Sequence, residues 1–516
     1  MALPEFRNEP LTDFSQDPGR AGMTEGLARV GRELGKEFPL VIGADRLRTG
    51  STFTSWNPSA KTEAVARCQK AAEAHVEQAV AAAERAFAAW SRVPAEERAA
   101  ILLRAADVLR RRKFWAAAWQ VYEVGKNWAE ADADVAETID FMEYYAREAL
   151  RWARGHETVP HPQEWSALTY VPIGVVAVIP PWNFPLAIPA GMTTAAIAAG
   201  NTVVMKPSSD SPANAYVLHE VLEAAGLPEG VLNIVTGSGS EVGDPLVLHP
   251  RVRMVAFTGS KEVGIRIYGQ AAQVAPGQVW LKRVIAEMGG KNALIVDESA
   301  DLEEAVAAAV VSGYGFQGQK CSAGSRLVVH ERRYREVLDA FAARVRDLRV
   351  GPAKDNFPIG PVINERARQT IMEYIGIGKR EGRLVAGGEP GDGEGFFVQP
   401  TAFADVDPRA RIAQEEIFGP VVAVIKARDF DHALEIANGT EFGLTGAVFT
   451  RAPEHIARAR REFMVGNLYI NRKSTGALVG VHPFGGFNMS GTDAKAGGPD
   501  YLGYFLQPKV VAIKHR

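Results

Sequence analysis

Apolar and polar positions follow two different patterns along the chain. Over residues 61–154, apolar side chains recur at spacings of three and four among alanine, glutamate and arginine, which predicts successive amphipathic helices. Farther on, short β-branched or aromatic runs end near Gly, Pro or Ser and are separated by helix-like segments. These runs cover residues 171–178, 202–205, 232–235 and 254–257. Strand and helix alternation at this spacing predicts βαβ units with a parallel sheet.

A second alternating block begins near residue 293. Its predicted strands are 293–296, 326–330 and 421–425, and its predicted helices are 302–314 and 334–348. We expect a second α/β domain that meets the first at Gly289–Gly290, where the chain can turn freely. One more strand is predicted over residues 504–514.

Length and charge narrow the class of protein. The chain has 516 residues, more than the ~250–300 at which a single core stops growing. Lys and Arg (58) nearly balance Asp and Glu (61), so no basic excess favours a nucleic-acid or membrane partner. The most apolar stretch, residues 171–205, is interrupted by prolines, and residues 1–13 lack the apolar core of a signal peptide. We expect a cytoplasmic protein.

Only two cysteines occur, which excludes a disulfide framework and a four-cysteine zinc site, and we expect no metal. Cys68 lies among Val65, Ala66 and Ala72 in a helix-like run and is expected to be buried packing. Cys321 follows a glycine-containing loop and precedes a strand, so it is either a reactive thiol in a cleft or one more buried cysteine. His330, nine residues of extended chain away, lies up to ~30 Å from it and is a poor partner base.

Three further segments are candidates for chemistry. Glu287 sits at the proposed domain junction, where a cleft is expected, although a lone Glu beside glycines is also typical of a solvated loop. Asn183 lies between prolines that fix the direction of its amide, either for an oxyanion or in a structural corner. The run from Phe257 to Gly264 turns from a strand into a helix with Ser260 as N-cap, which suits a phosphate or is a simple tight turn.

Together these segments resemble the aldehyde dehydrogenase superfamily from about Val41 onward. Six motifs match in order: Pro181-Trp182-Asn183-Phe184-Pro185, Lys206-Pro207-Ser208, Phe257-Thr258-Gly259-Ser260, Glu287-Met288-Gly289-Gly290-Lys291, Gly318-Gln319-Lys320-Cys321 and Glu415-Glu416-Ile417-Phe418-Gly419-Pro420. The resemblance implies a Rossmann-type cofactor domain (residues 1–155 and 171–288), an α/β catalytic domain (289–485) and a small β oligomerisation arm (156–170 and 486–516). Because such an arm cannot bury its own face, we expect a homo-oligomer, either a dimer or a trimer of dimers.

The resemblance also implies a mechanism. Cys321 attacks the aldehyde carbon, and Asn183 with the backbone N–H of Cys321 holds the oxyanion of the thiohemiacetal. Hydride transfer to a nicotinamide leaves a thioester, which a water activated by Glu287 hydrolyses.

For the cofactor, the resemblance points to Lys206 at the adenosine ribose hydroxyls, to Ser260 at the pyrophosphate, and to Glu416 with Phe418 at the nicotinamide ribose. Gly259, Gly264 and Trp182 are also expected to bind the cofactor. Family members that prefer NAD commonly carry Glu where this chain has Ser209. A carboxylate there repels a 2′-phosphate, so its absence predicts that NADP can serve alongside NAD.

Within the family, the chain is similar to the branch that oxidises L-glutamate γ-semialdehyde to L-glutamate in proline catabolism. The segments that carry this similarity are residues 6–10, 315–322 and 471–480. The similarity implies that Ser322, Gly476 and Ala477 hold the substrate α-carboxylate. It also implies that Phe184 and Phe484 line the aliphatic tunnel and that Glu137 meets the α-ammonium.

Residues 490–496 (Ser-Gly-Thr-Asp-Ala-Lys-Ala) depart from the Gly-Arg-Glu-Leu-Gly run of many other members, which argues against a general aliphatic aldehyde. Another aldehyde or semialdehyde remains an alternative substrate. A coenzyme-A-acylating enzyme and a non-catalytic binding protein of the same fold are two further alternatives. The presence of Glu287 argues against the first, and the joint presence of Cys321, Glu287 and Asn183 argues against the second.

Overall fold

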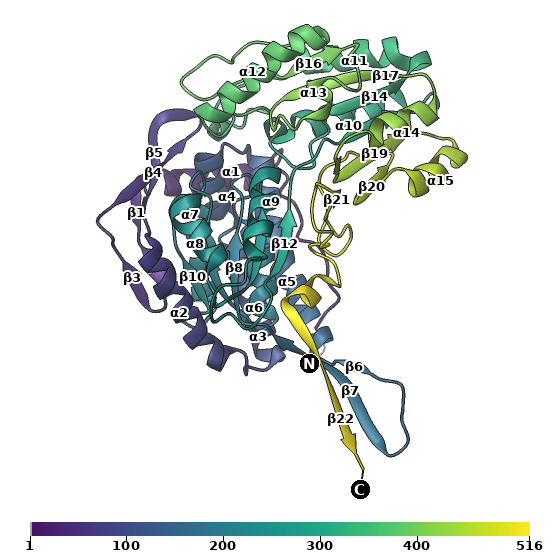
Figure 1. Cartoon of the computed structure of the whole chain (residues 1–516). Coiled ribbons are helices and arrows are strands. Elements are labelled where there is room, and N and C mark those ends of the chain that lie inside the picture. The colour runs from purple at the N-terminus through teal and green to yellow at the C-terminus, as the bar shows by residue number, and fades with distance from the viewer. Residues whose placement is uncertain (1–2, 516) are drawn as a thin grey trace.

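The computed structural model describes residues 3–515 and consists of two α/β units and a projecting β arm (Figure 1). Each unit is built on a seven-stranded sheet. Helices cover both faces of each sheet, so the strands read as continuous apolar runs instead of alternating ones. The mixed α/β class expected from the sequence is confirmed.

The first sheet has the strand order β12-β11-β8-β9-β10-β2-β3. Its strands are β2 (Leu40–Ile42), β3 (Asp45–Leu47), β8 (Val175–Ile179), β9 (Thr202–Met205), β10 (Leu232–Ile234), β11 (Val252–Thr258) and β12 (Arg283–Glu287). The pairs β10–β2 and β2–β3 are antiparallel, and the other pairs of this sheet are parallel. Along β8, Val176 and Val178 face one core cluster while Val175 and Ala177 face another. This two-sided burial explains the absence of polar residues from the strand.

Two sets of helices supply these clusters. One side carries α3 (Ala95–Arg111), α4 (Lys113–Val124), α5 (Trp128–Ala153), α6 (Ala187–Ala198) and α7 (Pro212–Ala224). The other carries α2 (Glu73–Trp90), α8 (Asp244–Leu248) and α9 (Lys261–Ala271). Helix α1 (Asp17–Gly31) packs on α4 at the edge of the first set.

The second sheet has the order β15-β16-β17-β14-β13-β19-β20. Its strands are β13 (Ala293–Val296), β14 (Arg326–His330), β15 (Arg383–Ala386), β16 (Thr401–Ala404), β17 (Val421–Ala427), β19 (Thr445–Phe449) and β20 (Asn467–Ile470). One face packs on α10 (Leu302–Tyr314) and α11 (Tyr334–Arg346). The other packs on α12 (Glu365–Glu381), α14 (Phe430–Asn438) and α15 (Pro453–Glu462). Only β15 runs antiparallel.

The chain order of the strands locates two crevices. In the first sheet, β9 lies on one side of β8 and β11 on the other, so the connections after β8 and β11 leave in opposite directions. Open α/β sheets bind ligands outside the carboxyl ends of their strands at such a point. The segments there begin with Pro180 and Gly259, and β12 ends beside them at Glu287. The hinge (residues 288–290) then leads into β13, so this edge faces the start of the second sheet.

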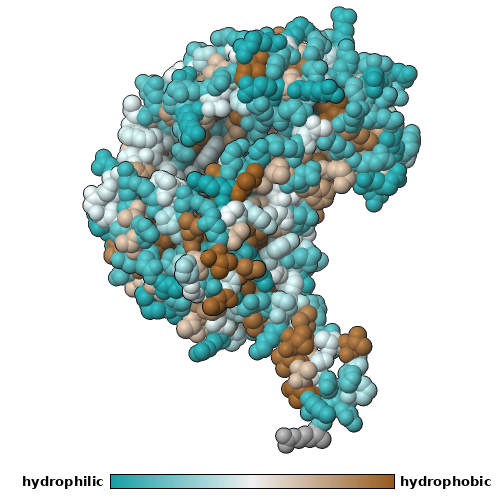
Figure 2. Space-filling view, viewed as in Figure 1, coloured by the Kyte–Doolittle hydropathy of each residue, from teal (hydrophilic) through white to brown (hydrophobic). Residues whose placement is uncertain are grey.

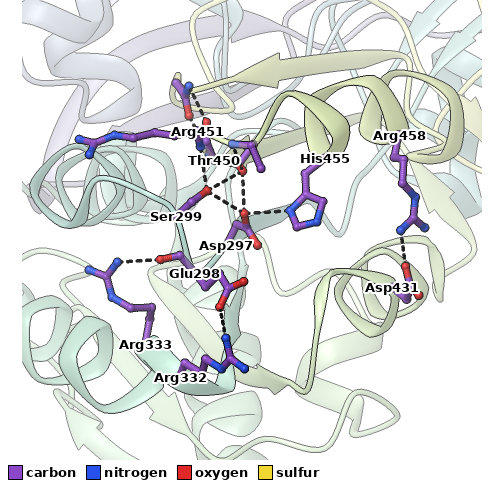
Figure 3. A network of polar contacts seen from close by, with 12 residues as sticks. Asp297, Glu298, Ser299, Arg332, Arg333, Asp431, Thr450, Arg451, His455 and Arg458 are labelled. Atoms are coloured by element: carbon purple, nitrogen blue, oxygen red, sulfur yellow. Dashed lines mark hydrogen bonds and ion pairs between the residues drawn. The ribbon is translucent and has the colours of Figure 1, made fainter.

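The corresponding point of the second sheet lies after β13 and β19 and is filled by side chains (Figure 3). Asp297 accepts hydrogen bonds from Thr450 Oγ1 (2.6 Å), Ser299 Oγ (2.9 Å) and His455 Nδ1 (3.0 Å). The His455 ring stacks on Phe430 with centroids 4.1 Å apart. This network ties β13, β19 and α15 together, which leaves the hinge edge for a site.

The arm consists of β6 (His156–Glu157), β7 (Glu164–Pro172) and β22 (Leu506–Lys514), and it extends away from both units (Figure 1). The expected arm began at residue 486, and the structure differs there. Tyr501, Leu502 and Phe505 are buried in the first unit's core, because they pack against α5 and α6. The C-terminal part of the arm therefore starts at Leu506.

One prediction about local structure is wrong. Residues 61–69 belong to strand β5 (Ala60–Gln69), which pairs with β1 (Lys36–Phe38) and β4 (Thr52–Asn57), and not to a helix. Cys68 is nevertheless fully buried, as expected, opposite Phe53 and Phe38. In residues 3–515, no helix is long and apolar enough to cross a membrane, and no cluster of His, Cys, Asp and Glu could hold a metal ion.

Candidate active site

The loop that carries Cys321 has an unusual backbone. Phe316, Gln317 and Gly318 take φ values of 50°, 57° and 66°, in the left-handed region that non-glycine residues rarely adopt. A Cβ atom on Gly318 would lie 2.3 Å from the carbonyl oxygen of Gly419, so only glycine fits. We call residues 315–321 the cysteine loop. Its strain must be held by the surrounding structure.

Buried polar side chains hold the cysteine loop in place. Gln317 Nε2 donates to the carbonyls of Pro361 (2.8 Å) and Gly125 (3.2 Å). Gln319 Oε1 accepts from the backbone N–H of Ile363 at 2.9 Å. These contacts anchor the loop to segments from both units, which fixes the position of the Cys321 sulfur.

Asn183 and the hinge approach the loop from the first unit. Asn183 is 4% exposed, and its Nδ2 donates to the Gln319 carbonyl at 3.0 Å. An amide nitrogen carries two hydrogens, so one remains for a second acceptor. On the other side, Asn292 Nδ2 donates at 2.8 Å to the carbonyls of Cys321 and Ala323. The structure therefore places Asn183 against the cysteine loop, two residues before Cys321. Its role at an oxyanion stays a prediction.

Glu287 ends β12 at the same edge. It is 9% exposed, and neither carboxylate oxygen has a hydrogen-bond partner within residues 3–515. Burial raises the pKa of Glu287 well above its usual range, and the Lys495 ammonium opposes that rise. A raised pKa makes the ionised form of Glu287 a stronger base than an exposed Glu, so that form is a candidate proton acceptor.

The Cys321 thiol is partly exposed and lies in a field of negative charge. Burial, followed by the Glu416 and Glu287 carboxylates, raises its pKa to about 12, while the Ser322 backbone N–H opposes the rise. The thiol is therefore protonated at neutral pH in this state. Its conversion to a nucleophile needs a base or a positive charge brought by a ligand.

The residues expected at the cofactor surround the crevice of the first sheet. Lys206 follows β9, is 6% exposed, and donates from Nζ to the Pro207 carbonyl at 2.8 Å. Its stem packs near Gly243, and burial lowers its pKa to about 8. Ser209 Oγ donates to the Gly237 carbonyl at 3.1 Å. A ribose hydroxyl in this crevice would contact the Lys206 ammonium, which is desolvated and hydrogen-bonded to one carbonyl.

The turn after β11 partly differs from expectation. Ser260 caps α9, because its Oγ accepts the Val263 N–H at 3.4 Å. The Gly259 N–H is not free for a phosphate, since it donates to the Glu287 carbonyl at 3.0 Å. Gly264 allows α9 to approach the hinge, because a Cβ there would lie 2.4 Å from Met288 Sδ. The first N–H groups of α9 remain the candidate anion donors.

Glu416 contacts the hinge from the second unit. Its Oε1 accepts the Gly290 N–H at 2.9 Å, and burial raises its pKa to about 7. Phe418 takes a φ of 55° and meets the Trp182 ring edge-on, with centroids 5.6 Å apart. A small cavity of about 10 Å³ lies between this segment and the cysteine loop. Its lining includes Gly290, Gly318, Lys320, Ser325, Glu416 and Phe418.

The residues expected at the substrate carboxylate are tied together by a contact that the sequence did not reveal. Ser474 Oγ donates to the Ser322 carbonyl at 3.1 Å, and Ser474 itself is fully buried. Gly476 has a φ of 75° and with Ala477 continues this segment. The Ser474 bond sets the distance between Ser322 and the turn at Gly476.

The aromatic residues and Glu137 lie on the remaining sides. The Lys126 ammonium lies 4.1 Å from the centroid of the Phe184 ring, an arrangement that favours one ring orientation. Phe484 is held by paired backbone hydrogen bonds to Ala496. Glu137 is partly buried on α5, and burial, with the nearby Asp134, raises its pKa to about 8. Glu137 is therefore not a fully solvated surface carboxyl group.

Sequence reasoning missed Asn292 and Ser474 as parts of this site. Asn292 directly follows the Glu287–Lys291 motif, so its position next to the motif was a signal in the sequence. Ser474 lies in a segment quoted for the substrate, but nothing in the sequence indicates which of its hydroxyls turns inward.

Comparisons with known proteins agree with this geometry. A profile of the aldehyde dehydrogenase family matches residues 47–511. A 1-pyrroline-5-carboxylate dehydrogenase of Geobacillus thermodenitrificans (strain NG80-2) is 57% identical over 508 residues, which cover 98% of this chain and 99% of the relative. Another, from Halalkalibacterium halodurans, is 55% identical over 99% of each chain. A solved Thermus 1-pyrroline-5-carboxylate dehydrogenase with bound NAD superposes with a TM-score of 0.98 at 52% identity, over 100% of both chains.

Proposed function

This chain belongs to the aldehyde dehydrogenase family, and from that premise we propose that it oxidises L-glutamate γ-semialdehyde, formed from 1-pyrroline-5-carboxylate, to L-glutamate in proline catabolism. The observation that carries the proposal is the meeting of Cys321, Asn183 and Glu287 at one edge. The full-length similarity to enzymes of that name supports the choice of substrate.

In the proposed reaction, the Cys321 thiol first loses its proton to solvent, and the resulting thiolate bonds to the aldehyde carbon, whose oxygen becomes an oxyanion. The second hydrogen of Asn183 Nδ2 is available to it, because the first is used by Gln319. Loss of hydride converts the thiohemiacetal to a thioester. Glu287 then takes a proton from a water molecule, whose oxygen attacks the thioester carbon and releases the carboxylate and the thiol.

We propose NAD as the hydride acceptor, since a similar solved structure contains it. The desolvated Lys206 ammonium and the α9 N-terminus capped by Ser260 suit a ribose and a pyrophosphate. Glu416 would accept from a ribose hydroxyl, and Phe418 with the Trp182 ring against it would flank the same part of the cofactor. Because Ser209 brings no carboxylate, we expect NADP to bind as well.

For the substrate, we propose that Ser322, Gly476 and Ala477 hold the α-carboxylate and that Phe184 and Phe484 flank the methylene chain. The glycine turn favours anion binding through its N–H groups. Glu137 would pair with the α-ammonium, and that cation would favour its ionised form.

We propose a homo-oligomer in the cytoplasm. The arm exposes Trp165 and Ile513, a cross-strand pair, together with Val510 and Val159. Apolar atoms are visible along the arm in Figure 2. Strand β20 forms an open edge of the second sheet, to which another strand could add. A reducing compartment suits a free Cys321 thiol.

We assign residues 1–155 and 171–288 to cofactor binding and residues 289–485 to catalysis, with the arm limited to residues 156–170 and 506–515. Residues 486–505 return from the second unit to the first, and β21 (Phe487–Asn488) pairs with β18 (Phe442–Gly443) on the way.

The test is NADH formation from glutamate γ-semialdehyde by the purified chain and by Cys321→Ala. We expect activity from the unchanged chain and none from the variant, with the same thermal unfolding for both. A panel of other aldehydes and coenzyme A separates the alternatives. Faster turnover of another aldehyde, or acyl transfer to coenzyme A instead of water, would overturn the proposal.

A further inference from the structure

A cation is held beside Glu287 by a segment to which the proposed reaction gives no role. We propose that Lys495 is a positioning residue for Glu287: its ammonium holds the segment that encloses the carboxyl group and favours the ionised form that activates water. This inference rests on the proposed function, in which Glu287 is the base for thioester hydrolysis.

The position of the Lys495 ammonium is fixed by two carbonyls. Its Nζ donates to the carbonyl of Gly466 at 3.0 Å and to the carbonyl of Gly485. The Lys495 side chain is 30% exposed, so its charge is only partly screened by water. The two glycines lie before β20 and after it, and the lysine therefore joins the second sheet to the segment that returns to Glu287.

Glycines bring that segment into contact with the carboxyl group. A Cβ on Gly485 would lie 3.3 Å from Glu287 Oε1, and a Cβ on Gly491 would lie 3.1 Å from Glu287 Oε2. The Ser490 carbonyl accepts the Met288 N–H at 2.8 Å, which fixes the segment against the end of β12. The carboxyl group thus lies between two glycines, one of which hydrogen-bonds Lys495.

The charges around Glu287 come from several elements. Asp493 lies on the same segment, 3.5 Å from Lys495 Nζ, and its charge favours the protonated form of Glu287. The Cys321 thiol faces the carboxyl group from the cysteine loop, and the hydroxyls of Tyr501 and Tyr504 face it from the C-terminal side. Of these groups Lys495 alone is cationic. It is the strongest of the influences that oppose the effect of burial on the pKa of Glu287.

The location agrees with the sequence. Residues 490–496 depart from the family pattern, and Lys495 lies inside this departure. Burial favours the protonated form of Glu287, and a fixed positive charge is a means by which this segment can keep the carboxyl group ionised.

The test uses three variants and the pH dependence of kcat under conditions where thioester hydrolysis limits turnover. Lys495→Met removes the charge at similar volume, so the acidic limb of the kcat profile should move to higher pH by about one unit. The pre-steady-state burst of NADH should persist, because formation of the thioester does not need the base. Lys495→Arg keeps the charge and should restore the limb toward its original position.

Asp493→Asn is the matched control of opposite sign. It removes the negative charge beside the same ammonium, so the acidic limb should move to lower pH. A Lys495→Met variant whose kcat falls equally at every pH, or whose limb stays in place, would overturn the inference and leave a purely structural lysine. If Lys495→Met does not fold, the test rests on Lys495→Arg and Asp493→Asn. An acidic limb that stays in place in Asp493→Asn, or that moves to higher pH, would then overturn the inference.

The outcome is separable from that of the proposed function. A wild-type chain that does not oxidise glutamate γ-semialdehyde counts against the substrate alone. The pH limbs are then measured with whichever aldehyde the wild type oxidises, and the same shifts are required.

Discussion

The position of the Cys321 thiol depends on the residues that precede it in the cysteine loop. Three residues before it adopt left-handed backbone angles, and buried amides from Gln317 and Gln319 hold the loop in that form. Strain of this kind persists only where the surroundings over-determine it. The loop should therefore tolerate few changes at Gly318 and depend on its partners for rigidity.

Gly318→Ala should reduce turnover by ~10²-fold or more, because displacement of a nucleophile by even ~1 Å has such an effect. The new Cβ would contact the Gly419 carbonyl, a backbone atom that cannot move aside. We expect a loss of ~1–3 kcal/mol in the free energy of unfolding as well. The control is Gly376→Ala, in the interior of α12 with no atom within 4 Å of the new Cβ. It should be neutral or stabilising, and turnover should not change.

Coenzyme choice is expected to depend on position 209. Ser209→Glu introduces a carboxylate three residues after Lys206. This carboxylate should repel the 2′-phosphate of NADP, whereas the ribose 2′-hydroxyl of NAD can donate a hydrogen bond to it. The ratio of kcat/KM for NADP to that for NAD should fall by ~10-fold or more. Ser209→Gln, of equal length and without charge, should change this ratio much less. An equal fall with both variants would show that size, not charge, decides.

The sequence motifs named candidates for the reactive residues, but they did not reveal all of the contacts that hold these candidates in place. Motif order brought Cys321, Asn183 and Glu287 to attention, whereas Ser474 was missed. Its role depends on which hydroxyl of the segment turns inward, and that is set by packing between distant strands. The engagement of the Gly259 N–H by Glu287 was missed for the same reason.

At the scale of elements, buried strands were predicted well and half-exposed ones poorly. Strands β8, β9 and β13 are covered on both faces, so an unbroken apolar run identifies them. Strand β5 mixes Ala, Lys, Thr, Glu and Arg, residues that also suit a helix. Strand β5 pairs with β4, which precedes it, and with β1, which lies more distant in the sequence. These pairings override the local preference for a helix.

Helix α7 depends on a carboxyl group from another helix. Glu123 is fully buried and accepts from the backbone N–H groups of Ala213 (2.8 Å) and Asn214 (3.1 Å) and from Asn214 Nδ2 (2.6 Å). Glu123→Ala leaves these donors unpaired, so the free energy of unfolding should fall by about 2–4 kcal/mol. Glu73→Ala, in the exposed first turn of α2, should cost only a few tenths of a kcal/mol. Denaturant unfolding measures both.

The same residue predicts a pH dependence of stability. Burial raises the pKa of Glu123 to about 7 in the folded chain, above its unfolded value. The folded state therefore binds a proton that the unfolded state releases, and this contribution is complete below the unfolded pKa and is lost as pH rises through about 7. Between about pH 5 and pH 8, wild type should lose more stability than Glu123→Gln, which stays neutral. Equal losses would contradict the assignment.

At the scale of the whole molecule, the site forms where the carboxyl ends of the first sheet's strands face the beginning of the second sheet. The carboxyl edge of the first sheet presents the ends of β8, β11 and β12, and the second sheet begins at the hinge with β13. The strand order that creates this crevice could be predicted only in part, because single-sequence patterns identify strands but not their neighbours. The Asp297 network closes the other crevice, so one catalytic site per chain is expected.

The exposed apolar side chains of the arm predict that it holds copies of the chain together. Trp165 and Ile513 face each other across β7 and β22, and both are about half exposed, although a lone strand pair has no core to stabilise it. Burial of such a pair against another copy would remove apolar area worth ~25 cal/mol per Å². Ile513→Lys should therefore shift the chain toward smaller species in light scattering at micromolar concentration.

The neighbouring Lys514→Ala supplies the control, because it changes charge at the arm's end without adding polarity to the apolar pair. It should leave the mass unchanged. Since Cys321, Asn183 and Glu287 all belong to one chain, the smaller species should keep its cysteine reactivity even if turnover falls. A monomeric wild type, or an Ile513→Lys variant of unchanged mass, would mean that the arm stabilises itself without a second copy, a result that its exposed apolar side chains make physically difficult to explain.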